Sequence, residues 1–108
     1  LYRAVYNLVE NAIKYNRPSG SVTVSIHTAE SAVLEVTDTG IGISPENQEK
    51  IFDPFYRVHK SRSRAMGGAG LGLALVSEIA RQHNGQVKVT QSSEKGSTIA
   101  LMLPVTLL

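Results

Sequence analysis

The sequence from Val33 to Ile43, VLEVTDTGIGI, predicts a short strand that runs into an aspartate and then into two glycines one residue apart. Alternation along this strand places Leu34, Val36 and Asp38 on one face, so the carboxylate shares the more apolar side. A carboxylate buried without a partner is unstable by several kcal/mol. Asp38 therefore requires a hydrogen-bond donor, either from the protein or from a ligand.

The two glycines that follow, Gly40 and Gly42, permit backbone conformations and close approaches that other residues cannot reach. A loop of this kind suits the surface of a flat or anionic ligand. Asp-x-Gly is also ordinary turn chemistry. On these residues alone, both interpretations stay open.

Length and composition indicate one soluble globular domain, residues 1–108. The net charge of +2 is too small to indicate a nucleic-acid partner. The chain has no cysteine, which excludes disulfides and thiolate metal sites. The longest apolar run, Gly67 to Val76, is shorter than the roughly 18 residues of a membrane span, so we expect no membrane contact.

A helix is predicted from Leu1 to Tyr15. No capping residue precedes it, so we expect that its natural beginning is missing. Its polar face aligns Asn7, Asn11 and Lys14. A solvated face is one explanation, but asparagine within a helix is less favourable than alanine by up to about 0.7 kcal/mol. The other explanation is that these amide side chains face a ligand. The predicted apolar arc comprises Leu1, Ala4, Val5, Leu8, Val9, Ala12 and Ile13.

A second strand is predicted at Val22, Val24 and Ile26, which alternate with polar residues as in a half-buried strand. We expect it to form an antiparallel hairpin with the Asp38 strand, through a loop of about four residues at Ala29–Ala32.

Ser44-Pro45-Glu46 predicts the start of a short helix, with serine as the N-cap and proline in the first turn. This helix is expected to end before Asp53-Pro54. Three aromatic residues lie nearby, and they either pack this helix on the core or contact a ligand. They are Phe52, Phe55 and Tyr56.

The sequence from Arg57 to Gly68 is basic and aperiodic, which predicts a mobile loop. Gly68-Ala-Gly-Leu-Gly72 then opens an apolar helix, Leu71 to His83, with Asn84-Gly85 as its C-cap. A glycine-rich helix N-terminus presents free backbone N–H groups, which suit a phosphate. The spacing matches neither the P-loop nor the dinucleotide fingerprint.

Two further strands, Gln86 to Gln91 and Thr98 to Leu103, are predicted around a turn at Ser93–Gly96. We expect an α+β two-layer sandwich. Helices 1–15 and 70–84 would cover one face of a mixed, mostly antiparallel sheet, with a ligand between the sheet end and the helix termini.

Five segments resemble the motifs of sensor histidine kinases, in the order typical of that family. They are Asn7-Leu-Val-Glu-Asn-Ala-Ile-Lys-Tyr15 (N box), Asp38-Thr-Gly-Ile-Gly42 (first glycine box), Phe52-Asp-Pro-Phe-Tyr-Arg57 (F box), Gly68-Ala-Gly-Leu-Gly-Leu73 (second glycine box) and Gly96-Ser-Thr98 (third glycine box). The resemblance implies the GHKL (Bergerat) ATP-binding fold. It also implies that the first strands of that fold and the dimerisation domain with its phosphoacceptor histidine are absent here.

The resemblance assigns ATP and Mg²⁺ as cofactors. Asn11 would hold Mg²⁺ through its amide oxygen, a hard ligand. Asn7 and Lys14 would contact phosphate, and Tyr15 would stack near the adenine. Asp38 would accept a hydrogen bond from the adenine 6-amino group.

The remaining nucleotide contacts implied by the family lie in the loops. Thr98 would lie near Asp38. The base would be lined by Gly40, Gly42 and Ile43, and Arg57 would reach a phosphate. The lid over the triphosphate would be shaped by Gly68, Gly70, Leu71 and Gly72.

The family's ATP-hydrolysing branches have a glutamate where this chain has Asn7. An amide cannot act as a general base, so we expect slow hydrolysis and transfer of the γ-phosphoryl group to an acceptor. Glu10, about 60° around the helix, is a candidate to assist proton removal, and a plain surface glutamate is the alternative. The implied catalytic set is Asn7, Glu10 and Lys14.

The family's acceptor is a helical histidine followed by an acidic residue. None of His27, His59 and His83 qualifies. The implied partners are therefore a separate dimerisation and histidine-phosphotransfer domain and a response regulator, in the cytoplasmic part of a membrane-anchored sensor. Two alternatives stay open: an ATPase or serine kinase of the anti-sigma type, and a binding module without catalysis.

Overall fold

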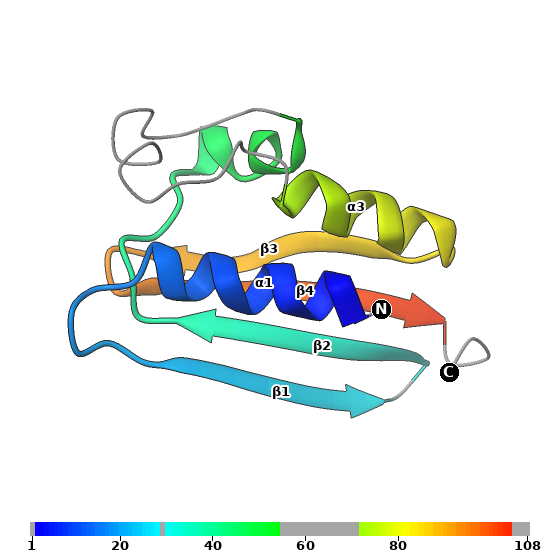
Figure 1. Cartoon of the computed structure of the whole chain (residues 1–108), viewed down its shortest axis with the longest axis horizontal. Helices are drawn as coiled ribbons and strands as arrows, with labels where there is room; N and C mark the ends of the chain where they lie inside the picture. Colours follow the sequence, from blue (N-terminus) through cyan, green and yellow to red (C-terminus); the bar gives the residue numbers. More distant parts are fainter. Residues whose placement is uncertain (1, 29, 55–71, 105–108) are drawn as a thin grey trace.

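The computed structural model describes residues 2–28, 30–54 and 72–104 as two layers, with two α-helices over one face of a sheet (Figure 1). The elements are α1 (Tyr2–Lys14), β1 (Val22–Thr28), β2 (Ser31–Asp38), the 3₁₀ turns η1 (Pro45–Asn47) and η2 (Lys50–Phe52), α3 (Gly72–Gln82), β3 (Gln86–Ser93) and β4 (Gly96–Pro104).

The sheet has the strand order β1-β2-β4-β3, and each neighbouring pair is antiparallel. The predicted α+β two-layer fold is confirmed. The sheet was expected to be mixed, which requires at least one parallel pair of strands. Among the described strands every pair is antiparallel. β2 and β4 are central, so Asp38 ends a strand that is paired on both sides.

The core lies between the helices and the two central strands. In the register of β2 and β4, Val36 is opposite Ile99 and Leu34 is opposite Leu101. Leu8 of α1 and Val76 of α3 are almost fully buried against this surface. Burying one such side chain contributes about 1.5–3 kcal/mol to folding. The prediction that Ile99, Leu101 and Leu103 face the core is confirmed, since all three belong to the buried core cluster.

The prediction that the strand at Val22–Ile26 is half-buried is wrong. β1 forms, but Val24 is 46% exposed and Ile26 is 69% exposed. β1 is the outer strand of the sheet, and only Val22 of its three apolar residues packs against the core. Alternation fixes which side chains share a face, whereas the placement of the helices decides whether that face is covered.

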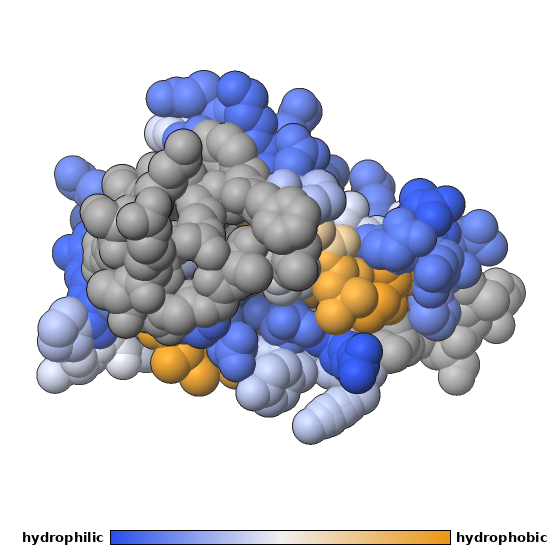
Figure 2. Space-filling model, turned by 45° about the horizontal axis from the view of Figure 1, so that its top comes forward, coloured by the Kyte–Doolittle hydropathy of each residue, from blue (hydrophilic) through white to orange (hydrophobic). Residues whose placement is uncertain are grey.

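The apolar arc predicted for α1 is narrower than expected. Its buried residues are Ala4, Leu8 and Ala12, one per turn, while Ile13 is 62% exposed. The two tyrosines Tyr2 and Tyr6 are also exposed, with ring centroids 6.3 Å apart. On the face shown in Figure 2, hydrophobic residues reach the surface in small patches among hydrophilic ones.

Two predicted boundaries need correction. The hairpin loop was expected at Ala29–Ala32, but β2 begins at Ser31 and only residues 29–30 separate the strands. β3 continues to Ser93 and β4 already begins at Gly96, so the turn between the two strands is shorter than predicted.

The helix predicted after Ser44 consists of the two 3₁₀ turns η1 and η2. Ser44 occupies the N-cap position with proline after it, but its side chain makes no cap bond. Its hydroxyl instead accepts a hydrogen bond of 2.7 Å from the Asn47 side chain. Phe52 packs against the core, as one of the two interpretations proposed. Phe55 and Tyr56 lie outside the described residues.

The predicted C-cap of α3 is confirmed. Asn84 has a φ of 60°, the left-handed conformation that ends many helices, and the Gly85 N–H donates to the Ala80 carbonyl at 2.8 Å. Gly85 also packs flat on β4, where a Cβ atom would lie 2.1 Å from the Met102 carbonyl oxygen. The helix end therefore anchors α3 to the sheet.

Neither α-helix of the described ranges has the length and apolar character needed to cross a bilayer.

Candidate functional site

Asp38 ends β2 with only 8% of its surface exposed. Its Oδ1 accepts hydrogen bonds from the Gly40 N–H at 2.9 Å and from the Ser97 N–H at 3.3 Å. Its Oδ2 accepts one longer bond, 3.4 Å from the Ser97 hydroxyl. The protein thus supplies the donor that burial requires. Since a carboxylate oxygen can accept two hydrogen bonds, Oδ2 has capacity for a further donor.

The turn interpretation of Asp38-Thr39-Gly40 is confirmed, whereas the ligand interpretation stays a prediction. The Gly40 N–H bonds to the side chain two residues before it, which is the Asx-turn pattern. The turn is therefore part of the site's construction, because it holds the carboxylate in a fixed position.

Thr98 is opposite Thr37, next to the pair formed by Asp38 and Ser97, and its place near the adenine stays a prediction. The Thr98 hydroxyl is 2.9 Å from that of Thr37, and the hydroxyl that reaches Asp38 belongs to Ser97. Ser97 is directly opposite Asp38 in the register of β2 and β4. Alternation back from Ile99 places Ser97 on the same face as Ile99 and Leu101, but its pairing with Asp38 depends on the register of the two strands.

Two glycines bring backbone strands into contact around Asp38. Gly96 has a φ of 135°, and a Cβ atom there would lie 1.9 Å from the Asp38 carbonyl oxygen. Gly42 has a φ of 78°, and a Cβ atom there would lie 2.1 Å from the Ser93 carbonyl oxygen. Both positions combine a left-handed backbone with a close approach, so only glycine fits without rearrangement.

The same loop is fixed to the neighbouring segments at two more points. The Ile43 N–H donates to the Ser92 hydroxyl at 2.6 Å. Gly40 packs on the end of α1, where a Cβ atom would lie 2.3 Å from the Tyr15 carbonyl oxygen. Four of the predicted base-lining residues therefore come together, namely Tyr15, Gly40, Gly42 and Ile43.

The polar face of α1 carries the predicted phosphate and metal residues Asn7, Asn11 and Lys14. The Asn7 side-chain amide donates to the Arg3 carbonyl at 2.7 Å. Its Oδ1 faces the start of α3, where a Cβ atom on Gly72 would lie 3.0 Å away. The structure thus brings Asn7 of the N box against Gly72, which is far from it in the sequence.

Glu10 contacts two neighbours on the outer side of α1. Its carboxylate forms an ion pair with Lys14 at 3.4 Å. A hydrogen bond to the same carboxylate raises the pKa of Tyr6. These contacts account for Glu10 as a surface residue, and its assistance in proton removal stays a prediction.

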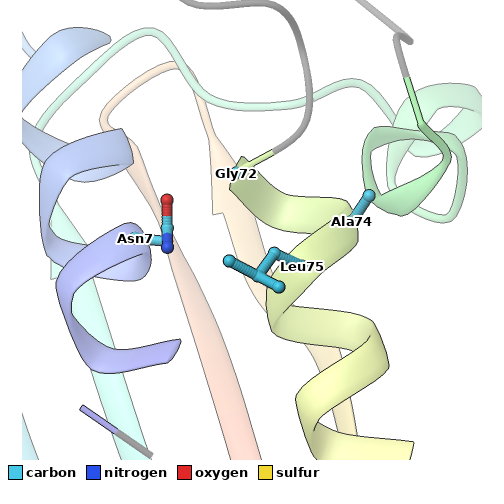
Figure 3. Close-up of a pocket in the computed structure, with 4 residues that line it drawn as sticks. All are labelled: Asn7, Gly72, Ala74 and Leu75. Atoms are coloured by element: carbon cyan, nitrogen blue, oxygen red, sulfur yellow. The ribbon is translucent and has the colours of Figure 1, made fainter. Parts of the chain in front are cut away.

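An open pocket lies between α1 and the first turn of α3, lined by Asn7, Gly72, Ala74 and Leu75 (Figure 3). Leu75 points toward α1, next to the Asn7 amide. Ala74 and Leu75 are not among the predicted site residues, because their place in this pocket depends on how α3 packs against α1. Arg57, Gly68, Gly70 and Leu71 lie outside the described residues, as does the predicted mobile loop.

Residues 1–107 match the family model described as histidine kinase-, DNA gyrase B- and HSP90-like ATPase. Among curated proteins, the sensor histidine kinase RppB of Synechocystis is 46% identical over 106 residues. That match covers 97% of this chain and 23% of RppB. The chain therefore spans about a quarter of the length of this relative.

Among solved structures, the mycobacterial sensor histidine kinase MprB superposes with a TM-score of 0.81 at 35% identity, covering 94% of this chain and 70% of that one. Full-length ShkA in complex with AMPPNP gives a TM-score of 0.80 at 29% identity, and the match covers 94% of this chain and 20% of ShkA. The fold of this chain is thus the fold found in sensor histidine kinases.

Proposed function

Because the chain belongs to the family of histidine kinase-, DNA gyrase B- and HSP90-like ATPases, we propose that residues 1–108 are the catalytic domain of a sensor histidine kinase. In this proposal the domain binds Mg-ATP. It transfers the γ-phosphoryl group to a histidine on a separate dimerisation domain, from which the group passes to an aspartate of a response regulator.

The observation that carries the proposal is the state of Asp38. Its Oδ1 is held by two backbone N–H groups, while its Oδ2 accepts only the 3.4 Å bond from Ser97. A 6-amino group of adenine is a donor of the right kind for Oδ2. The glycines beside it pack against neighbouring backbone and fix the loop that carries this carboxylate. Full-length ShkA, which shares the fold, has been solved with AMPPNP, an analogue of ATP.

The phosphate end of the proposed site is the polar face of α1. Asn7 and Lys14 supply an amide and a cation for phosphate oxygens, and Asn11 supplies an amide oxygen for Mg²⁺. Gly72 keeps the start of α3 free of a side chain where it faces Asn7. When bound, the metal ion neutralises charge on the phosphates.

A kinase, rather than an ATPase, is favoured by Asn7. Its amide donates to the Arg3 carbonyl and has no basic site near neutral pH. Water that approaches the γ-phosphate would therefore meet no general base at this position. The phosphoryl group is instead kept for an acceptor that is positioned in line with it.

The acceptor histidine is proposed to lie on another domain. His27 is on the outer strand β1, where its ring is 3.0 Å from Glu35. His83 is at the end of α3, with its Nδ1 2.9 Å from the Ile79 carbonyl. Neither belongs to the proposed nucleotide site, and His59 lies outside the described residues. The proposal also places the domain in the cytoplasm, as part of a membrane-anchored sensor.

The test is a phosphotransfer assay with γ-labelled ATP and Mg²⁺. The isolated chain should acquire no acid-labile label, whereas an added dimerisation domain from a relative such as RppB should acquire one. Asn11→Ala should abolish that transfer. Acid-stable label on a serine would indicate a kinase of the anti-sigma type instead. Stoichiometric label on His27, His59 or His83 would refute the separate acceptor.

A further inference from the structure

The connection between α1 and β1 is bonded to the residue that directly follows Asp38. The Asn16 Oδ1 accepts a hydrogen bond of 2.8 Å from the Thr39 hydroxyl and one of 2.8 Å from the Arg17 N–H. The Asn16 amide nitrogen donates to the Ser21 carbonyl at 2.8 Å. Each polar atom of the Asn16 side chain thus has a partner on the loop between α1 and β1 or on Thr39.

Thr39 completes the network from the other side. Its hydroxyl accepts a 2.8 Å hydrogen bond from the Ser21 N–H while it donates to Asn16. Its own N–H donates to the Ser21 carbonyl at 3.2 Å. Gly20 packs on this pair, since a Cβ atom there would lie 2.3 Å from the Asn16 Oδ1 and 2.5 Å from the Thr39 Oγ1.

Arg17 extends the network to the other loops around Asp38. Its Nε donates to the Gly40 carbonyl at 3.3 Å, and its Nη2 donates to the Glu94 carbonyl in the turn between β3 and β4. Three loops that are separate in the sequence therefore meet at Asn16 and Arg17.

The position of this network connects the two ends of the proposed nucleotide site. Asn16 lies two residues after Lys14, just beyond the end of α1, the helix that carries the proposed phosphate and metal residues. Thr39 is covalently next to Asp38, the proposed adenine contact. The hydrogen bond between their side chains is a direct side-chain link between the two halves.

We propose that Asn16 and Thr39 are positioning residues that fix the distance and angle between the base end and the phosphate end of the site. This inference rests on the proposed function. A nucleotide that occupies both ends gains affinity from binding its second part at high effective concentration. That gain depends on the alignment of the two ends. Loss of the link should therefore reduce the affinity for ATP more than the affinity for adenosine or for triphosphate alone.

We expect the fold to remain stable without this link. α1 and β2 are already held together by the burial of Leu8 and Val36, and both Asn16 and Thr39 are only partly buried. Substitution of the pair is therefore expected to preserve the core and to change the relation between the loops.

The test compares three probes, ATP, adenosine and inorganic triphosphate, by chemical-shift titration in the presence of Mg²⁺. In Thr39→Val and in Asn16→Ala, ATP affinity should fall about five- to tenfold, the size expected for one hydrogen bond. Adenosine and triphosphate should bind as they bind the unmodified chain. The double variant should lose less affinity than the sum of the two single losses, because both changes remove the bond between Asn16 and Thr39.

Two further variants serve as controls. Thr39→Ser retains the hydroxyl and should restore ATP affinity. Thr23→Val makes the same chemical change on the exposed side of β1 and should have no effect.

Unchanged ATP affinity in both variants would overturn this inference alone. An equal loss for all three probes, with a lowered melting temperature, would overturn it in favour of a structural role. Failure of the unmodified chain to bind ATP would overturn the proposed function, and this inference with it.

Discussion

The two ends of the candidate site are constructed in different ways. At the base end, Asp38 is buried and held by backbone N–H groups, with glycines that bring neighbouring backbones into contact. At the phosphate end, Asn7 and Lys14 are partly exposed side chains on one helix face, bonded to Arg3 and Glu10. The base end is therefore arranged by folding itself, whereas we expect the side chains at the phosphate end to exchange partners when a ligand binds.

This difference predicts how each end responds to substitution. A change at the base end should affect both stability and binding, because the same contacts serve both. A change at the phosphate end should affect binding alone.

The largest effect is expected at Gly96. In Gly96→Ala, a Cβ atom would lie 1.9 Å from the Asp38 carbonyl oxygen, at a φ of 135° that alanine rarely adopts. The free energy of unfolding should fall by about 3 kcal/mol or more, as measured by urea denaturation. Gly72→Ala is the matched change at the phosphate end, where the nearest atom is the Asn7 side chain at 3.0 Å. It should leave stability within about 1 kcal/mol and weaken ATP binding. Equal stability losses would remove the distinction between the two ends.

The next largest effect concerns the carboxylate. Asp38→Asn would remove the proposed charge-assisted hydrogen bond to adenine, so ATP binding should weaken by about 1.5–3 kcal/mol. Calorimetric titration of both proteins measures this change. An unchanged affinity would mean that Asp38 holds the loop without contacting the base.

Asn11→Ala should remove most of the Mg²⁺-dependent part of ATP affinity, roughly tenfold, with no change in melting temperature. Titrations with Mg²⁺ and with a chelator separate the two parts. If the unmodified chain binds ATP equally well under both conditions, the metal role of Asn11 is wrong.

Asn7→Glu tests the choice between transfer and hydrolysis at the same end. The glutamate would supply the missing general base, so slow ATP hydrolysis should increase while the fold stays intact. Phosphate release measures the rate, and Asn7→Gln is the control without a basic group. Equal rates in the two variants would argue against this role for position 7.

The smallest effect is expected away from both ends, on the exposed side of α3. A hydrogen bond from Arg81 lowers the pKa of Glu78, so this carboxylate stabilises the fold above its ordinary pKa of 4.5. That contribution is lost as the pH falls through the lowered, folded-state pKa. Glu78→Gln should slightly reduce the melting temperature at pH 7, with no effect on ATP binding. A difference between the two proteins that persists below that pKa would require another cause.

Local patterns in the sequence predict much of this arrangement. The face shared by Leu34, Val36 and Asp38 follows from strand alternation, and the alignment of Asn7 and Asn11 follows from helical periodicity. Both are properties of one element. The left-handed C-cap at Asn84 is likewise a local preference.

Most of the predictions that failed concern relations between elements. The exposure of Val24 and Ile26 depends on which strand lies at the edge of the sheet, and the pocket residue Leu75 depends on how the two helices pack. The contact of Ser97 with Asp38 depends on the register of two strands far apart in the sequence. At Ser44, a local side-chain bond to Asn47 replaces the expected cap, a competition that residue preferences alone do not resolve.

Base selectivity tests the central claim most directly, because it depends on the preorganised end and on the proposed ligand together. Guanine presents an oxygen where adenine presents an amino group, so Asp38 would face a second acceptor. Calorimetric titration of the unmodified chain with Mg²⁺ should therefore show binding of ATP, with GTP weaker by up to roughly 10⁴-fold. Binding of GTP as tight as that of ATP, or no binding of ATP, would contradict the account.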